Sequence, residues 1–157
     1  MASISKMNAK LRLLKEINSG AYNALCEAIA LRTAIGEKQA LRILKKVNPR
    51  AYAQFQERTG NREEALAYFS ASESGEELIH GAELAYGLSK YELARALLTK
   101  ARGASERSLR ESEYHAMYPF SESSGMGEAM SYLNHQDEHR RNCAKISAIE
   151  EKLAGLK

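Results

Sequence analysis

Two histidines one helical turn apart are the residues of this chain best spaced for chemistry. His135 and His139 enclose Gln136, Asp137 and Glu138. On a helix, side chains four positions apart lie on one face, so both imidazoles can reach the same metal ion. An acid beside them can activate a metal-bound water molecule. The sequence therefore offers a candidate metal site at His135 and His139.

The same five residues resemble the H-x-x-E-H motif of the inverted zinc peptidases, a resemblance that implies zinc-dependent hydrolysis. That family uses a larger, mixed α/β domain. Cys143 lies about 12 Å along a straight helix from His135, too far to share a metal with both histidines. A third ligand must come from elsewhere, and the alternative is a solvated helix face. No other catalytic grouping accompanies the pair, so we predict no enzyme and no cofactor, with metal binding as the third functional hypothesis.

A basic segment from Leu88 to Glu113 is the candidate for nucleic-acid binding. It resembles a helix-turn-helix of the repressor type, which implies two helices and a dimeric DNA-binding regulator. Its glycine, Gly103, comes later than in that family. The alternative is two surface helices with solvated arginines. The candidate residues are Lys90, Arg95, Lys100, Arg102, Arg107 and Arg110.

Aromatic residues gather at the end of this basic segment. Tyr114, Tyr118 and Phe120 stand within seven positions of one another. Tyrosine gives a large contact area at a low entropic cost, which suits a binding surface. The three residues are therefore candidates for contact with another protein, and core packing is the alternative.

A repeated pattern of a small, a large and a second small or branched residue indicates helical hairpins. Its copies are Ala40/Leu44/Val47, Ala65/Phe69/Ser72 and Ala94/Leu98/Ala101. The segment around the middle copy, with Gly60 at its turn, resembles half of a tetratricopeptide repeat. The copies lie 25 and 29 residues apart, whereas that family repeats about every 34 residues. Irregular hairpins also form grooves that receive partner helices.

These candidates must be positioned by helices, because the composition excludes a sheet. Val47 is the only valine, against 24 alanines and 18 leucines. Branched side chains favour strands, and the chain has no run of them. We predict an all-α fold, an irregular multi-helix bundle of short helical hairpins with a longer C-terminal helix.

Capping residues set the predicted helix boundaries. Asn48 and Pro49 open one helix, and Gly60 follows its end. Asn61 with Glu64, and Ser89 with Glu92, have capping-box spacing. The predicted helices are 5–18, 21–35, 37–47, 49–58, 62–72, 76–86, 89–102 and one from 105 that ends before Pro119.

The Ser- and Gly-rich segment 119–127 is the predicted linker between a bundle, 1–118, and a C-terminal helix, 128–157. In that helix Asn142, Ile146, Ile149, Leu153 and Leu156 alternate at spacings of four and three. This is the pattern of a short coiled coil. It predicts either a homodimer through 142–156 or a terminal helix that lies back on the bundle.

Bulk properties narrow the class of protein. Residues 1–60 carry 11 Lys or Arg against 4 acids, although the whole chain has a net charge of only +3. Two isolated cysteines and no apolar signal core or membrane span predict a cytoplasmic protein without a membrane partner. The leading hypothesis is a small protein-binding or regulatory module that acts through helical surfaces, with the DNA-binding regulator as the alternative.

Overall fold

The computed structural model describes residues 13, 15–17, 19–20, 37–118 and 125–156. Their regular structure is helical throughout, as the composition predicts: α3 (Glu37–Val47), α4 (Pro49–Arg58), α5 (Arg62–Ala71), α6 (Gly75–Gly87), α7 (Tyr91–Met117) and α8 (Gly125–Ala154). The all-α bundle is therefore confirmed. None of the described helices is both long and apolar enough to cross a membrane. The chain forms two compact units, Met1–Tyr68 and Phe69–Lys157.

The first unit is built on the α3–α4 pair. Leu44 of α3 is buried with Ala51 and Phe55 of α4, and Leu13 and Ile17 pack against this cluster. Asn48 is the single residue between the two helices. Its Oδ1 accepts a hydrogen bond from the Ala51 backbone N–H at 2.9 Å. The predicted cap is thus confirmed, and Pro49 occupies the first turn, where its missing N–H is not needed.

The turn after α4 is also where the sequence places it. Thr59 caps α4, and Gly60 has φ +94°, a left-handed conformation that favours glycine. Beyond the turn the predicted capping box does not form. The Asn61 N–H donates to the Gln56 carbonyl at 2.8 Å, and Glu64 accepts from Lys45 Nζ instead.

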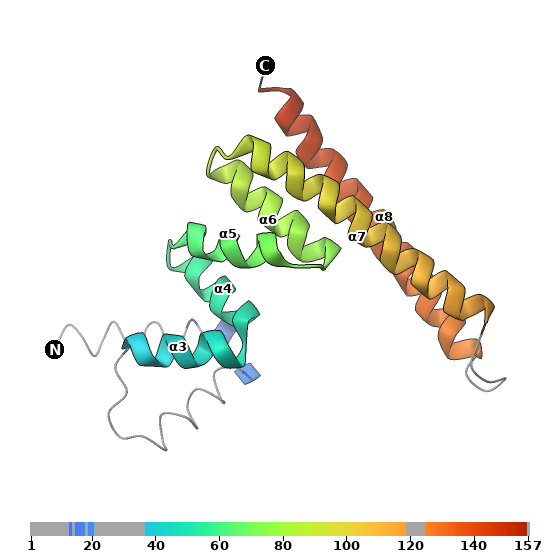
Figure 1. Cartoon of the computed structure of the whole chain (residues 1–157), viewed down its shortest axis with the longest axis horizontal. Helices are drawn as coiled ribbons and strands as arrows, with labels where there is room; N and C mark the ends of the chain where they lie inside the picture. Colours follow the sequence, from blue (N-terminus) through green and yellow to red (C-terminus); the bar gives the residue numbers. More distant parts are fainter. Residues whose placement is uncertain (1–12, 14, 18, 21–36, 119–124, 157) are drawn as a thin grey trace. The chain divides into compact units, whose positions relative to one another are not determined.

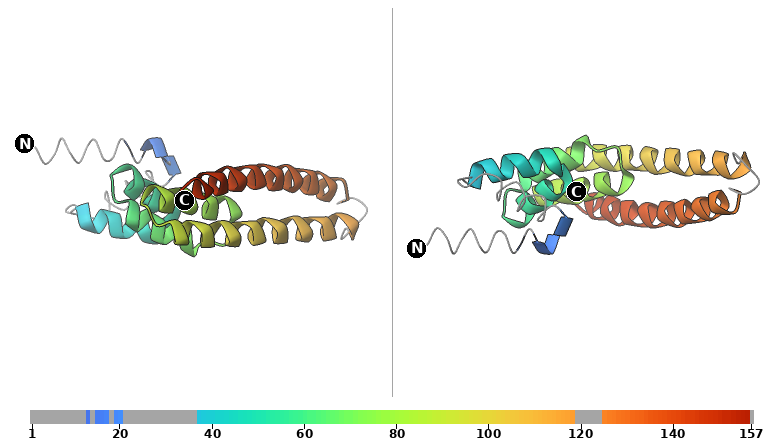
Figure 2. Two further views of the ribbon diagram at one scale, coloured as in Figure 1. Left: turned by 90° about the horizontal axis from the view of Figure 1, so that it is seen from above. Right: turned by 90° about the horizontal axis from the view of Figure 1, so that it is seen from below.

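The second unit is a three-helix assembly in which α6, α7 and α8 contact one another (Figure 1). Both further views show α7 and α8 side by side along their length (Figure 2). The helices bury their apolar residues on facing sides: Leu78, Ile79, Ala82 and Ala85 on α6, Ala94, Leu97, Leu98 and Ala101 on α7, and Ile146, Ile149 and Leu153 on α8.

Two glycines allow α6 to approach its neighbours closely. A Cβ added at Gly75 would lie 3.4 Å from the Ala101 carbonyl oxygen and from Asn142 Nδ2. A Cβ added at Gly81 would lie 3.2 Å from Cβ of Phe69, which is buried. A side chain at Gly81 would require Phe69 to shift by a few tenths of an ångström, whereas one at Gly75 would make contacts at the edge of the ordinary range.

Helix α7 corrects the prediction of two helices with a turn between them. It runs without a break for 27 residues through Gly103, so a helix-turn-helix is not formed in this segment. Ala101, Ala104 and Ser105 are buried around this position. Their burial favours a continuous helix and outweighs the roughly 1 kcal/mol that a glycine costs in a helix interior.

The start of α7 also differs from the prediction. Lys90 is its N-cap residue, and Ser89 ends α6 in a left-handed conformation with φ +59°. The predicted Ser89–Glu92 capping box is therefore wrong.

The predicted linker, 119–127, joins α7 and α8 within the second unit. Residues 119–124 lie outside the described part, and α8 begins at Gly125.

Candidate functional site

The seam between α7 and α8 changes character along its length. Near α6 it is apolar, and Ile146, Ile149 and Leu153 are buried there. Beyond Ser105 the same three-and-four spacing continues with polar residues. They are Ser105, Ser108, Ser112 and His115 on α7, and Glu128, Ser131, His135 and His139 on α8. Figure 1 shows that the two helices extend past the end of α6 in this region.

At the junction of the two halves, a chain of contacts joins the helices. Ser105 Oγ lies 2.9 Å from His139 Nδ1, and His139 Nε2 lies 3.5 Å from Cys143 Sγ. Ser105 is buried, whereas His139 and Cys143 are half-buried. Both ring nitrogens of His139 therefore have a partner within the chain.

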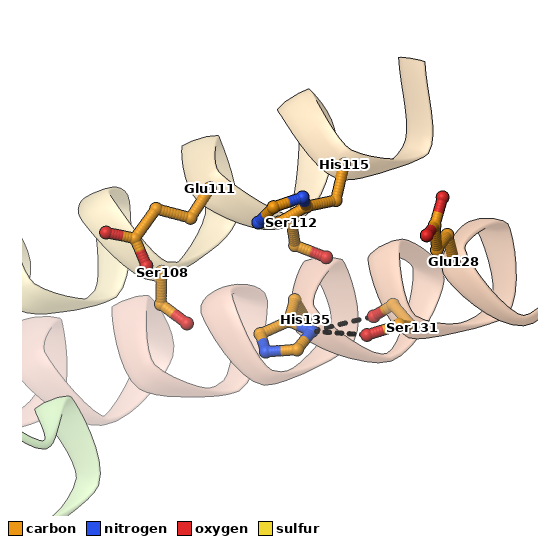
Figure 3. Close-up of a pocket in the computed structure, with 7 residues that line it drawn as sticks. All are labelled: Ser108, Glu111, Ser112, His115, Glu128, Ser131 and His135. Atoms are coloured by element: carbon orange, nitrogen blue, oxygen red, sulfur yellow. Dashed lines mark hydrogen bonds between the residues drawn. The ribbon is translucent and has the colours of Figure 1, made fainter. Parts of the chain in front are cut away.

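A pocket of about 410 Å³ opens in the polar half of the seam. Figure 3 shows its lining drawn from both helices, with Glu111 toward one end, Glu128 at the other, and His115, Ser112 and His135 between them. The residues that line it are Ser108, Glu111, Ser112, His115, Glu128, Ser131 and His135. Volumes of this size hold small molecules.

The hydrogen bonds of His135 fix its tautomer. Nδ1 lies 2.7 Å from the Ser131 backbone carbonyl oxygen. A carbonyl oxygen can only accept, so Nδ1 carries the hydrogen. In the neutral imidazole, Nε2 is then a hydrogen-bond acceptor. In that neutral form, His135 brings a hydrogen-bond acceptor to the pocket lining.

Glu128 has an unmet hydrogen-bonding requirement. Its Oε2 atom is buried and has no hydrogen-bond partner in the part of the chain that the structure describes. A buried acceptor without a donor is unfavourable, and more so when it is charged. Because the Glu128 side chain also lines the pocket, a donor that enters the pocket is one group that could satisfy this carboxylate.

Six of the seven residues that line the pocket lie in an acidic stretch, which Arg110 precedes and Arg140 follows. From Glu111 to Glu138 the chain holds six acids and no lysine or arginine. The six are Glu111, Glu113, Glu122, Glu128, Asp137 and Glu138. This end of the hairpin therefore attracts cations and repels anions.

The predicted metal pair, His135 and His139, lies on one face of α8, as the spacing requires. The two side chains nevertheless have different surroundings, since His135 lines the pocket and His139 contacts Ser105 and Cys143. Among the described residues, no group of three or more His, Cys, Asp or Glu is arranged to hold a metal ion. The structure thus brings no third ligand to the pair.

The predicted aromatic surface is exposed where the structure describes it. Tyr114 and Tyr118 are 61% and 66% exposed, and their rings lie 5.1 Å apart. Phe120 lies outside the described residues.

Four of the six basic candidates in and before α7 are engaged within the chain. Arg95 pairs with Glu92, and Arg102 Nη2 lies 3.1 Å from both carboxylate oxygens of Glu150. Lys100 Nζ donates to the Ser72 carbonyl oxygen at 2.9 Å, just beyond the end of α5. Lys90 also has a partner. Arg107 and Arg110 are exposed and have no ion pair with the residues that the structure describes.

Sequence reasoning did not single out Ser108, Glu111, Ser112, Glu128 or Ser131 as site residues. The available signal was the spacing of the serines, which continues the apolar seam positions of α7. A small polar residue at such a position predicts that the helix packs through a polar interface. It does not predict which helix lies on the other side of that interface.

Comparison of the sequence with known protein families found no match, and comparisons with curated proteins and with solved structures found none either.

Proposed function

We propose that this chain is a small protein-binding module that docks a partner through the far end of the α7–α8 hairpin. The supporting observation is the position of its exposed apolar side chains. Nine large apolar residues are exposed in the described part, and six of them lie at this end. They are Tyr114 and Met117 on α7, its C-cap residue Tyr118, and Met126, Met130 and Leu133 on α8.

Each helix presents its share as a stripe. Tyr114 and Met117 have the spacing of three that places side chains on one helix face, and the ring of the C-cap residue Tyr118 lies 5.1 Å from that of Tyr114. Met126, Met130 and Leu133 follow the spacing of four and three on α8. Clustered exposed apolar residues mark binding surfaces, and methionine adapts to the shape of a partner. Aromatic anchors supply most of the binding energy in such surfaces.

The test is partner capture with matched variants. The full chain, immobilised, is exposed to a lysate of its host, and bound proteins are identified by mass spectrometry. Tyr114→Ser with Tyr118→Ser should abolish capture of a specific partner, whereas Leu156→Ser, a change of an exposed apolar residue at the other end of α8, should not. Equal capture by all three proteins would exclude this surface.

Nucleic-acid binding is the alternative proposal, supported by the exposed side chains of Arg107 and Arg110. Because α7 is one continuous helix, these two arginines would contact DNA from a single helix and not from a helix-turn-helix. Affinity for a mixed duplex DNA should fall steeply with salt, and Arg107→Ala with Arg110→Ala should weaken it further. Unchanged binding of DNA by this double variant would remove the two arginines from the proposal.

A further inference from the structure

The seam pocket has the chemistry of a receptor for organic cations. Its two carboxylates, Glu111 and Glu128, and the Nε2 atom of His135 are hydrogen-bond acceptors. None of the described residues that line it is a lysine or arginine. A ligand that fits this lining must bring hydrogen-bond donors and positive charge.

The buried Oε2 atom of Glu128 gives the strongest indication of a ligand. It faces no donor in the described structure, although the side chain forms part of the pocket wall. Because Oε2 is closed to solvent in this structure, a charged donor in the pocket would reach it after a rotation of the Glu128 side chain, and would then neutralise the carboxylate. Hydrogen bonds to charged groups are among the strongest that proteins make.

The positions of the two carboxylates indicate the shape of the ligand. Figure 3 shows Glu111 toward one end of the pocket and Glu128 at the other. The imidazoles and hydroxyls lie between them. Carboxylates at opposite ends suit a linear molecule with a positive group at each end better than a single small cation.

Metal ions and anions fit this site less well than an amine. No group of three metal-ligating side chains is assembled in the described part of the chain. Anions would meet the acidic stretch 111–138, which holds no lysine or arginine.

We propose that the seam pocket binds alkylammonium groups, with a linear diamine or polyamine as the best-fitting ligand, one ammonium group at Glu111 and one at Glu128. The same chemistry is carried by the lysine side chain of a partner protein. This site is on the α7–α8 seam and is distinct from the apolar stripes proposed to dock a partner.

Isothermal titration calorimetry of the full chain at low ionic strength tests the proposal. Putrescine and spermidine should bind, n-butylamine should bind at least about tenfold more weakly because it makes one charged hydrogen-bonding contact instead of two, and succinate should not bind. A peptide with one lysine, compared with its acetyl-lysine form, distinguishes the sources. Tighter binding of the lysine peptide than of putrescine would assign the site to a protein side chain.

Variants locate the binding. Glu128→Gln and Glu111→Gln should each weaken putrescine by about tenfold or more, whereas Glu113→Gln, in the same acidic stretch but outside the lining, should leave it unchanged. Thermal unfolding monitored by circular dichroism verifies that each variant is folded.

Three results would overturn the proposal. The first is that putrescine, spermidine and the lysine peptide all fail to bind at millimolar concentration. The second is that putrescine and n-butylamine bind with equal affinity. The third is that all three variants lose the same affinity for putrescine. The last two would show general attraction to the acidic stretch and not a site.

Discussion

Side chains of the same type have different roles in this chain because their neighbours differ. His135 is held by the Ser131 carbonyl and lines a pocket, whereas His139, one turn later, lies between Ser105 and Cys143. Glu128 has a buried oxygen without a donor among the described residues, whereas Glu64 is exposed and accepts from Lys45 at 2.8 Å. Residues whose polar groups are satisfied within the chain stabilise the fold, whereas residues that line the pocket are available to a ligand.

Glu64 leads to a prediction at the residue scale. The hydrogen bond and the charge of Lys45 lower the pKa of Glu64 from its usual 4.5, and Glu64 raises the pKa of Lys45 from 10.5. A lowered carboxyl pKa stabilises the folded state above pH 4.5, and this contribution is lost as pH falls through the folded-state value. A raised lysine pKa stabilises below pH 10.5 and is lost as pH rises above it.

The difference in Tm between the natural chain and Glu64→Gln should therefore be small but present at pH 7 and should vanish at strongly acidic pH. It should also shrink with salt, because both groups are exposed. Thermal unfolding at several pH values measures it. The double variant Lys45→Met with Glu64→Gln is the control, and a difference that persisted in strong acid would contradict the ion-pair explanation.

At the scale of elements, helix boundaries could be predicted from the sequence where a single residue sets them through its own side chain or backbone conformation. Asn48 caps α4 through its own side chain, and Gly60 adopts a positive φ that few other residues accept. The turn predicted near Gly103 is wrong because no neighbouring residue distinguishes a glycine inside a helix from a glycine in a turn. The contacts that keep α7 continuous there come from residues distant in sequence.

Ser89 gives a prediction at this scale. It has φ +59° after α6, where the Lys90 N–H donates to the Ala85 carbonyl at 2.8 Å and the Ser89 N–H to that of Tyr86 at 3.0 Å. This is a Schellman arrangement, which prefers glycine at the left-handed position. Ser89→Gly should raise the free energy of unfolding by about 1 kcal/mol because it removes the strain at Cβ.

Urea unfolding measures this change. Ser74→Gly is the matched control, since Ser74 has an extended backbone and makes no side-chain cap bond. It should give no comparable gain. If Ser89→Gly were neutral or destabilising, the backbone at Ser89 would not be strained as described.

At the scale of the whole molecule, the sequence predicted that one stripe of the C-terminal helix is buried, but it did not predict which helices cover that stripe. The spacing of Ile146, Ile149 and Leu153 indicates burial equally well in a dimer or within the chain. In the structure these side chains are buried in a unit where α8 contacts α6 and α7. The pocket residues could not be paired from sequence for the same reason. Ser112 and His135 lie 23 positions apart, and only the packing of α7 on α8 brings them to one cavity.

Ile146→Ala tests this arrangement. Ile146 is fully buried, so its truncation should lower the free energy of unfolding by about 2 to 5 kcal/mol. The mass by light scattering should not change, and Leu156→Ala, at an exposed position, should have little effect on either quantity. A shift from dimer to monomer with stability unchanged would instead indicate an intermolecular seam.

The change from leucine and isoleucine to serine and histidine along α7 and α8 also has a kinetic consequence. The apolar half is buried against α6, whereas the polar half extends past the end of α6 (Figure 1). The serine and histidine contacts that join the polar half exchange readily with water. We therefore expect local opening of the pair to begin in the polar half, which lets a molecule enter the seam while the apolar half stays folded.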